Sequence, residues 1–201
     1  MLENDRLGMI LGAAFFTFWI GQRFHFSYRP TVIWWLVTFQ FCLFVIAYLS
    51  RHPAQEHAHG FWEIVFPFIC AALPFALDNY PFKPPGRIVI SAPVYMGLML
   101  AGTALIIAGV AWLRRSFSIM TEARPPVVKG VYRIFRHPMY LGSMVASLGL
   151  LLCNYNHLNL IIFLVFCAAQ AYRSRREENK IAAVYPYYRD YMAQTRWLWK
   201  I

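Results

Sequence analysis

Val127-Val-Lys-Gly-Val-Tyr-Arg-Ile-Phe-Arg-His-Pro-Met-Tyr-Leu-Gly-Ser143 is a basic loop that runs directly into an apolar segment. Within it, Pro138 suits the first position of a helix, because the N–H that proline lacks would have no partner there. The stretch therefore predicts a helix that begins at Pro138 and has His137 as its N-cap. It places a polar, positively charged loop at the point where a new membrane segment would start.

The N-terminus of this predicted helix is a candidate binding site for a polar or anionic ligand. Its first N–H groups carry partial positive charge and attract carboxylate or phosphate. We expect three of them to point into the loop, those of Met139, Tyr140 and Leu141. Arg133 and Arg136 add full positive charges. A basic boundary loop that only anchors to lipid head groups explains the same residues equally well.

The composition is that of an integral membrane protein. Of the 201 residues, 59% are hydrophobic and 14% are charged, whereas soluble domains carry about 25% charged residues. A membrane-spanning helix needs about 20 mostly apolar residues. Six segments are candidates, namely 7–24, 31–50, 61–77, 91–113, Met139–Cys153 and Leu158–Tyr172. The sequence predicts a single-domain, all-α integral membrane protein with five or six transmembrane helices.

The charges divide the chain into two parts. Residues 114–201 hold 13 of the 19 Lys and Arg residues but only 4 of the 9 Asp and Glu residues. Positive segments of membrane proteins stay in the cytoplasm, and the same charges attract anionic lipids. We expect residues 1–113 to form the N-terminal spans, with residues 114–201 adding a cytoplasmic ligand-binding loop, a helical hairpin and a cytoplasmic C-terminal helix. The membrane would be the cytoplasmic (inner) membrane.

The last two apolar segments and the tail predict a hairpin followed by an interfacial helix. The short turn Asn154-Tyr-Asn-His157 joins the two segments, which favours an antiparallel pair. After Arg173 the helix should continue for at least two turns, because Arg, Glu and Lys favour helices. Pro186 would break it. Aromatic and basic residues beyond it, up to Trp197 and Trp199, suit the membrane interface.

Arg173 and Glu177 lie four residues apart and share one face of this predicted helix. An exposed ion pair between them would gain only about 0.3 kcal/mol. A carboxylate that emerges from a membrane helix beside a basic loop is a candidate for holding a cationic ligand. The alternative interpretation is an ordinary solvated run of charges.

Several classes of function are disfavoured. The chain has no Gly-rich dinucleotide motif, Walker loop, G-x-S-x-G or zinc spacing, which excludes a soluble nucleotide-binding domain. Nucleic-acid binding is a poor fit, because the aromatic residues lie mostly in apolar runs. The four cysteines lack metal spacing, and His52, His57 and His59 are only a weak candidate set. We expect no metal.

Four motifs occur together in the C-terminal half: Gly130-Val-Tyr132, Arg136-His137-Pro138-Met-Tyr140, Glu177-Glu178-x-x-Ile181 and Tyr188-x-x-Tyr191. In this combination, residues 112–197 resemble the isoprenylcysteine carboxyl methyltransferase and phospholipid methyltransferase superfamily. The resemblance implies S-adenosylmethionine (the methyl donor) as cofactor. By matching position, the residues implied to bind it are Tyr132, His137, Pro138, Tyr140 and Glu177. We expect Met139, within the same motif, and the backbone of Val127 and Val128, where the chain departs from the family pattern, to contribute as well. Glu177 would hold the donor's ammonium group.

The resemblance also implies a lipophilic methyl acceptor that enters from the bilayer. Arg173 would face this acceptor as the catalytic residue, and Arg136 would also contact it. A carboxylate acceptor, as in isoprenylcysteine methylation, is already a nucleophile at neutral pH, and an arginine would orient it. The alternatives are a phospholipid N-methyltransferase, whose amine must first lose a proton, a NADPH-dependent membrane reductase, and a non-enzymatic protein that binds anionic lipid.

Overall fold

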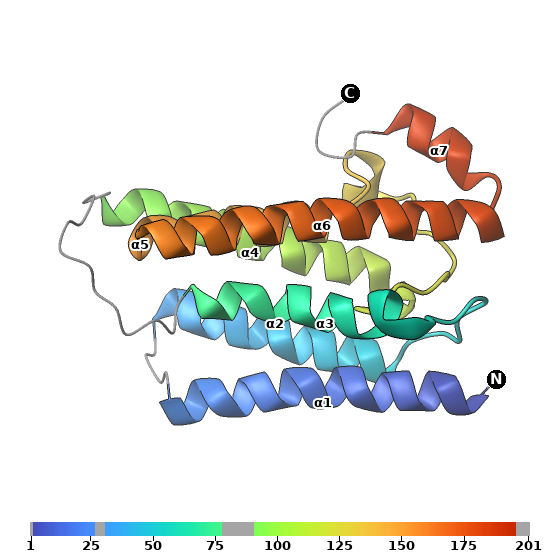
Figure 1. The fold of residues 1–201 in the computed structure, drawn as a ribbon, viewed down its shortest axis with the longest axis horizontal. Coiled ribbons are helices and arrows are strands. Elements are labelled where there is room, and N and C mark those ends of the chain that lie inside the picture. The colour runs from blue at the N-terminus through green and yellow to red at the C-terminus, as the bar shows by residue number, and fades with distance from the viewer. Residues whose placement is uncertain (1, 27–30, 78–90, 196–201) are drawn as a thin grey trace.

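The computed structural model describes residues 2–26, 31–77 and 91–195, which form an elongated bundle of helices (Figure 1). The elements are α1 (Leu2–Phe26), α2 (Val32–Leu49), α3 (Gly60–Ala76), α4 (Ala92–Leu113), α5 (Pro138–Cys153), α6 (His157–Val184) and α7 (Tyr188–Gln194), with short 3-10 turns at Arg114–Ser116 and Gly130–Arg133. Within the described residues there is no strand, only an isolated bridge between Glu56 and Ala123. The predicted all-α fold class is confirmed for this part of the chain.

Within the described ranges, three helices are long and apolar enough to cross a membrane, over Arg6–His25, Val32–Leu49 and Ala92–Ser116. Two further apolar helices are shorter, α3 with 17 residues and α5 with 16. α6 is apolar in its first half and charged in its second. These helices indicate a membrane protein, while the number of spans and the side that faces the cytoplasm stay predictions.

The outer surface of the bundle is apolar, as a lipid-facing surface requires. Large side chains on several helices are about half exposed, among them Trp35, Ile46, Val65, Ile161 and Val165. A soluble protein of this size would keep such patches small. In a bilayer the same side chains contact lipid tails.

The six long helices lie roughly parallel, and the two ends of the bundle differ (Figure 1). α1 begins and α6 ends at one end, which also carries α7 and the loop 114–137; we call this the loop end. The opposite end holds the turn between α5 and α6, and we call it the turn end. α5 ends at Cys153 and α6 begins at His157. The predicted helical hairpin is confirmed.

An aromatic cluster joins α1, α2 and the loop after α4. Phe16, Phe44, Tyr48 and Phe117 are almost fully buried, and the rings of Phe44 and Phe117 stack with their centroids 5.1 Å apart. The backbone N–H of Ile119 donates a hydrogen bond to the Tyr48 hydroxyl over 2.6 Å. This cluster therefore fixes the beginning of the loop against α2.

α4 and α5 approach each other so closely that only glycine fits between them. A Cβ atom added to Gly102 would lie 2.4 Å from the carbonyl oxygen of Gly142, and one added to Gly142 would lie 2.7 Å from the carbonyl oxygen of Gly102. Small residues of this kind let membrane helices pack backbone to backbone. α5 is thereby held tightly against α4.

α6 extends well beyond its apolar half and ends where the sequence predicts. It continues to Val184, Tyr185 is its C-cap, and α7 begins at Tyr188, so Pro186 separates the two helices. At the loop end, Lys180 forms an ion pair of 2.7 Å with Glu63 in the first turn of α3. The expected interfacial residues Trp197 and Trp199 lie outside the described residues.

Candidate active site

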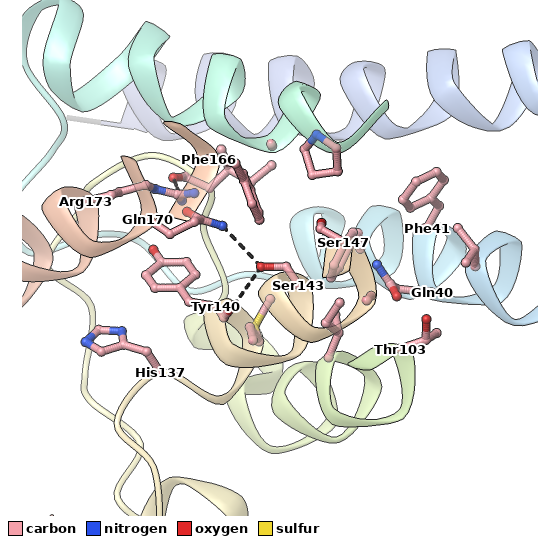
Figure 2. Close-up of a pocket in the computed structure, with 18 of the residues that line it drawn as sticks. Gln40, Phe41, Thr103, His137, Tyr140, Ser143, Ser147, Phe166, Gln170 and Arg173 are labelled. Atoms are coloured by element: carbon pink, nitrogen blue, oxygen red, sulfur yellow. Dashed lines mark hydrogen bonds between the residues drawn. The ribbon is translucent and has the colours of Figure 1, made fainter. Parts of the chain in front are cut away.

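A cavity of about 920 Å³ runs between the helices, from the loop end toward the turn end. α2, α4, α5 and α6 supply most of its walls, and the loop 114–137 and α7 line it at the loop end. Its lining is charged and aromatic at the loop end, and polar again at the turn end, where Asn154, Asn156 and Asn159 contribute. Figure 2 shows its side chains, with His137, Tyr140 and Arg173 toward one side of the view.

The start of α5 has the geometry that the sequence predicts, apart from one donor. Pro138 is the first residue of the helix, and His137 is its N-cap. The N–H of Leu141 is not free, because it donates to the carbonyl oxygen of His137 over 3.0 Å in the first helical hydrogen bond. The prediction of three free groups was therefore wrong for Leu141. Met139 and Tyr140 remain as the first-turn N–H donors.

Tyr140 brings together the two residues predicted on one face of α6. Its hydroxyl donates a 2.5 Å hydrogen bond to Glu177 Oε2, and the Arg173 guanidinium carbon lies 5.0 Å from the centre of its ring. Arg173 is 6% exposed and donates from Nη2 to the carbonyl oxygen of Ile119. Its buried Nε has no hydrogen-bond partner. One cationic donor thus stays available beside a carboxylate that is held in place.

The neighbouring Glu178 has different partners from Glu177. Its Oε1 accepts a 2.7 Å hydrogen bond from Arg136 Nε and lies 2.9 Å from His137 Nε2. Burial raises the pKa of Glu178, but the His137 hydrogen bond and the charges of His137 and Arg136 outweigh burial, so the pKa is lowered. Glu178 is therefore ionised and serves to hold the N-terminus of α5 against α6.

Arg136 also holds α7. Its Nη1 donates to the carbonyl oxygens of Met192 and Thr195, over 2.7 and 3.2 Å. These carbonyls lie at the C-terminal end of α7, where a helix favours a positive charge. Since its charge is matched by Glu178 and its Nε and Nη1 atoms donate to Glu178 and α7, Arg136 positions other elements. Its expected contact with the acceptor stays a prediction.

Aromatic rings form the remaining walls of the loop end. The His137 ring stacks parallel to the Tyr140 ring with 5.1 Å between centroids, and Tyr132, Tyr188 and Tyr191 complete the lining. Burial raises the pKa of Tyr132 and of Tyr188 far above the usual value, and that of Tyr191 to about 12. These phenols therefore stay neutral and offer ring faces and hydroxyl donors.

The structure places most of the predicted site residues on this one cavity. The residues that line it are Val127, Tyr132, Arg136, His137, Met139, Tyr140, Arg173 and Glu177. Pro138 is fully buried behind this surface. Val128 lies outside it, 38% exposed, in a separate depression shared with Arg133 and α7. Two residues further on the chain turns at Gly130, where φ is +62° and an added Cβ would clash with Trp112.

Sequence reasoning missed two groups of residues around the cavity. Glu122 accepts hydrogen bonds from Ser118 at 2.7 Å, from Arg124 at 2.8 Å and from Arg51 at 3.3 Å, and so stabilises the loop before Val127. Gln170, one turn before Arg173, donates to Ser143 over 3.2 Å. An uncharged polar residue inside an apolar segment was the only available signal for Gln170. In the part of the chain that the structure describes, no cluster of three or more His, Cys, Asp or Glu residues could hold a metal.

Residues 93–187 match the family model described as phospholipid methyltransferase. The matched segment, 95 of the 201 residues, is similar to that family. The match runs from α4 to just beyond α6, so it includes Tyr140, Arg173 and Glu177. It confirms the resemblance, but starts earlier than the expected residue 112 because it includes α4, and it ends before the expected residue 197, so Tyr188-x-x-Tyr191 lies beyond it. The similarity to the phospholipid methyltransferase family supports a membrane methyltransferase.

A curated relative gives a second comparison. The "Cobalt-zinc-cadmium resistance protein CzcN" of Cupriavidus metallidurans is 25% identical over 141 residues. The alignment covers 70% of this chain and 62% of the relative, which is less than two thirds of the relative's length. Its name refers to resistance to three metals, whereas the matched phospholipid methyltransferase family is defined by methyl transfer.

Proposed function

We propose that this protein is an S-adenosylmethionine-dependent membrane methyltransferase that acts on a lipophilic acceptor. The observation that carries the proposal is the meeting of Glu177 and Arg173 at Tyr140, within the loop end of the cavity. The volume of about 920 Å³ is in the range of ligand sites in proteins. The phospholipid methyltransferase segment supplies both the α5 and the α6 side of this arrangement.

The residues present fit the chemical groups of the donor. Glu177 would hold its ammonium group, and the N–H groups of Met139 and Tyr140 would receive its carboxylate. The face of Tyr132 suits a sulfonium ion. When bound, the donor supplies an electrophilic methyl group whose bond to sulfur breaks, the electron pair staying on sulfur, as the acceptor forms its bond to carbon.

Arg173 favours a carboxylate as the acceptor. Its Nε is buried without a partner, and no acidic side chain among the described residues is paired with it. A carboxylate oxygen held there needs no general base, and orientation by the arginine would do most of the catalytic work. An amine acceptor, as in phospholipid N-methylation, would need to lose a proton, and the raised pKa values of Tyr132 and Tyr188 make their phenols poor bases.

We further propose that the 201 residues form one domain with the loop end in the cytoplasm and the helices in the inner membrane. The excess of Lys and Arg in residues 114–201 supports this orientation. The same charges would attract anionic lipids to the loop end. Lipid binding without catalysis is the alternative that the following experiment separates.

Calorimetric titration of S-adenosylmethionine into the purified protein tests the proposal. We expect micromolar binding that Glu177→Ala weakens about 100-fold, because truncating one partner of a buried charge pair costs several kcal/mol. Glu56→Ala is the matched control, since Glu56 is a half-exposed carboxylate that lies 3.7 Å from Lys180 and outside the cavity. Unchanged affinity in Glu177→Ala would contradict the role of Glu177. A folded wild-type protein that binds NADPH and no S-adenosylmethionine would indicate the reductase instead.

A further inference from the structure

Three uncharged polar side chains face the cavity halfway along their helices. Gln40 in α2, Thr103 in α4 and Ser147 in α5 are 7%, 3% and 2% exposed, and all three line the cavity. Each lies within about two residues of the midpoint of its helix, by the bounds of α2, α4 and α5. Figure 2 shows them on the side of the view away from His137. We call these three residues the polar belt.

Polar groups at this depth are costly unless they are hydrogen-bonded. A hydroxyl or amide in an apolar environment without a partner costs about 1–3 kcal/mol, and polar residues inside a membrane commonly mark a substrate path. Among the hydrogen bonds of the described residues, none involves the side chains of Gln40, Thr103 or Ser147. The belt therefore presents donors and acceptors to whatever fills the cavity.

Gln170 extends this polar lining toward the loop end. The Ser143 hydroxyl donates its one proton to the carbonyl oxygen of Tyr140, so it can only accept from Gln170, and the Gln170 amide nitrogen must face it. The Gln170 Oε1 atom is then left buried without a partner. Along α5, Ser147 lies seven residues beyond Tyr140, which is about 10 Å at the rise of an α-helix.

We propose that the polar belt binds an uncharged hydrogen-bonding group, a hydroxyl or a carbonyl, in the hydrocarbon part of the methyl acceptor. This group would lie about 10 Å from the atom that is methylated. The inference rests on the proposed function and narrows its acceptor to a lipid carboxylate with an oxygenated chain. A plain prenyl or saturated acyl chain would leave Gln40, Thr103 and Ser147 unpaired in the membrane interior.

The test compares radiolabelled fatty acids of equal length: a saturated acid, its mid-chain hydroxylated counterpart and its mid-chain keto counterpart. Binding is measured on the protein in lipid nanodiscs without S-adenosylmethionine, and empty nanodiscs give the background. We expect the oxygenated acids to bind about tenfold more tightly, the effect of one well-formed hydrogen bond. Equal affinity for the three acids, or binding of none, would overturn the proposal.

Variants test whether the polar belt causes the tighter binding of the oxygenated acids. The triple change Gln40→Leu, Thr103→Val and Ser147→Ala should remove the tenfold preference and leave S-adenosylmethionine binding intact. Ser174→Ala is the control, because Ser174 is a fully buried serine of α6 that bonds its own helix outside the cavity. A preference that survives in the folded triple variant would also overturn the proposal. Failure of donor binding in the wild type would instead contradict the proposed function, so the two failures are distinguishable.

Discussion

The two sides of α5 face different surroundings. Toward α4 its backbone lies against another backbone, with Gly142 opposite Gly102 and Gly149 against the carbonyl oxygen of Tyr95. Toward α6 it borders a cavity, into which Tyr140 and Ser147 project. A single short helix is thus anchored on one side and leaves a hollow on the other. The comparison shows how a membrane bundle can hold a site rigidly without filling it.

The largest expected effect, on stability, comes from disrupting the close packing of α5 on α4. Gly102→Val places a side chain where the first added atom already lies 2.4 Å from backbone atoms of α5, and overpacking of this kind costs about 3 kcal/mol. We expect a marked drop in the thermal unfolding midpoint in detergent. Gly97→Val is the matched control, because an added Cβ at Gly97 in the same helix meets no atom within 4 Å. Equal losses in the two variants would contradict backbone-to-backbone packing of α4 on α5.

An intermediate effect is expected on the hollow side. Tyr140→Phe keeps the ring under Arg173 and removes only the hydroxyl that donates to Glu177. A hydrogen bond to a charged group contributes about 1.5–3 kcal/mol, so S-adenosylmethionine should bind about tenfold more weakly while the unfolding midpoint changes little. Tyr185→Phe removes a hydroxyl without a partner and should leave the Kd unchanged. A Tyr140→Phe protein with wild-type affinity would show that Tyr140 does not orient Glu177.

The smallest effect concerns the loop end, where α5 begins. Glu178 has a pKa below its ordinary value of 4.5, so its contribution to stability is complete above that value and is lost as the pH falls through the lowered pKa. Glu178→Gln should therefore reduce stability by about 1 kcal/mol at neutral pH. Unfolding curves from about pH 7 to about pH 4 measure the difference in unfolding free energy between the wild type and Glu178→Gln. This difference should become smaller at the acidic end. A difference in unfolding free energy that grows on acidification would contradict the lowered pKa of Glu178.

The helices could be predicted from the sequence because their signals are local. Apolar runs, the turn Asn154–His157, and the prolines at 138 and 186 each determine a boundary through neighbouring residues alone. The N-cap at His137 follows from the same local chemistry. One detail needed more than the local signal. That the Leu141 N–H is bonded to the His137 carbonyl oxygen follows only when the helical hydrogen bonds are counted from the N-cap.

The cavity could be predicted only where the family motif supplied residues. Tyr140 and Glu177 belong to the motifs, and spacing predicts Arg173 on the face of Glu177, but the meeting of the three depends on how α5 and α6 are placed. Gln40 and Thr103 come from helices that carry no motif, so nothing local distinguishes them from ordinary polar residues in a span. Glu177 and Glu178 also have different roles, because Glu177 contacts Tyr140 whereas Glu178 contacts Arg136 and His137. These contacts depend on the placement of the helices.

The hydrogen bonds that Arg136 donates to the C-terminal end of α7 have a consequence for turnover. Tyr188 and Tyr191 of α7 line the loop end of the cavity, so a movement of α7 would widen this end for a molecule as large as S-adenosylmethionine. That movement breaks the bonds from Arg136 to the carbonyl oxygens of Met192 and Thr195. The rate at which spent donor leaves, rather than the methyl transfer itself, would then set the pace of the enzyme. The strength of the Arg136 hydrogen bonds to α7 would then determine the turnover rate.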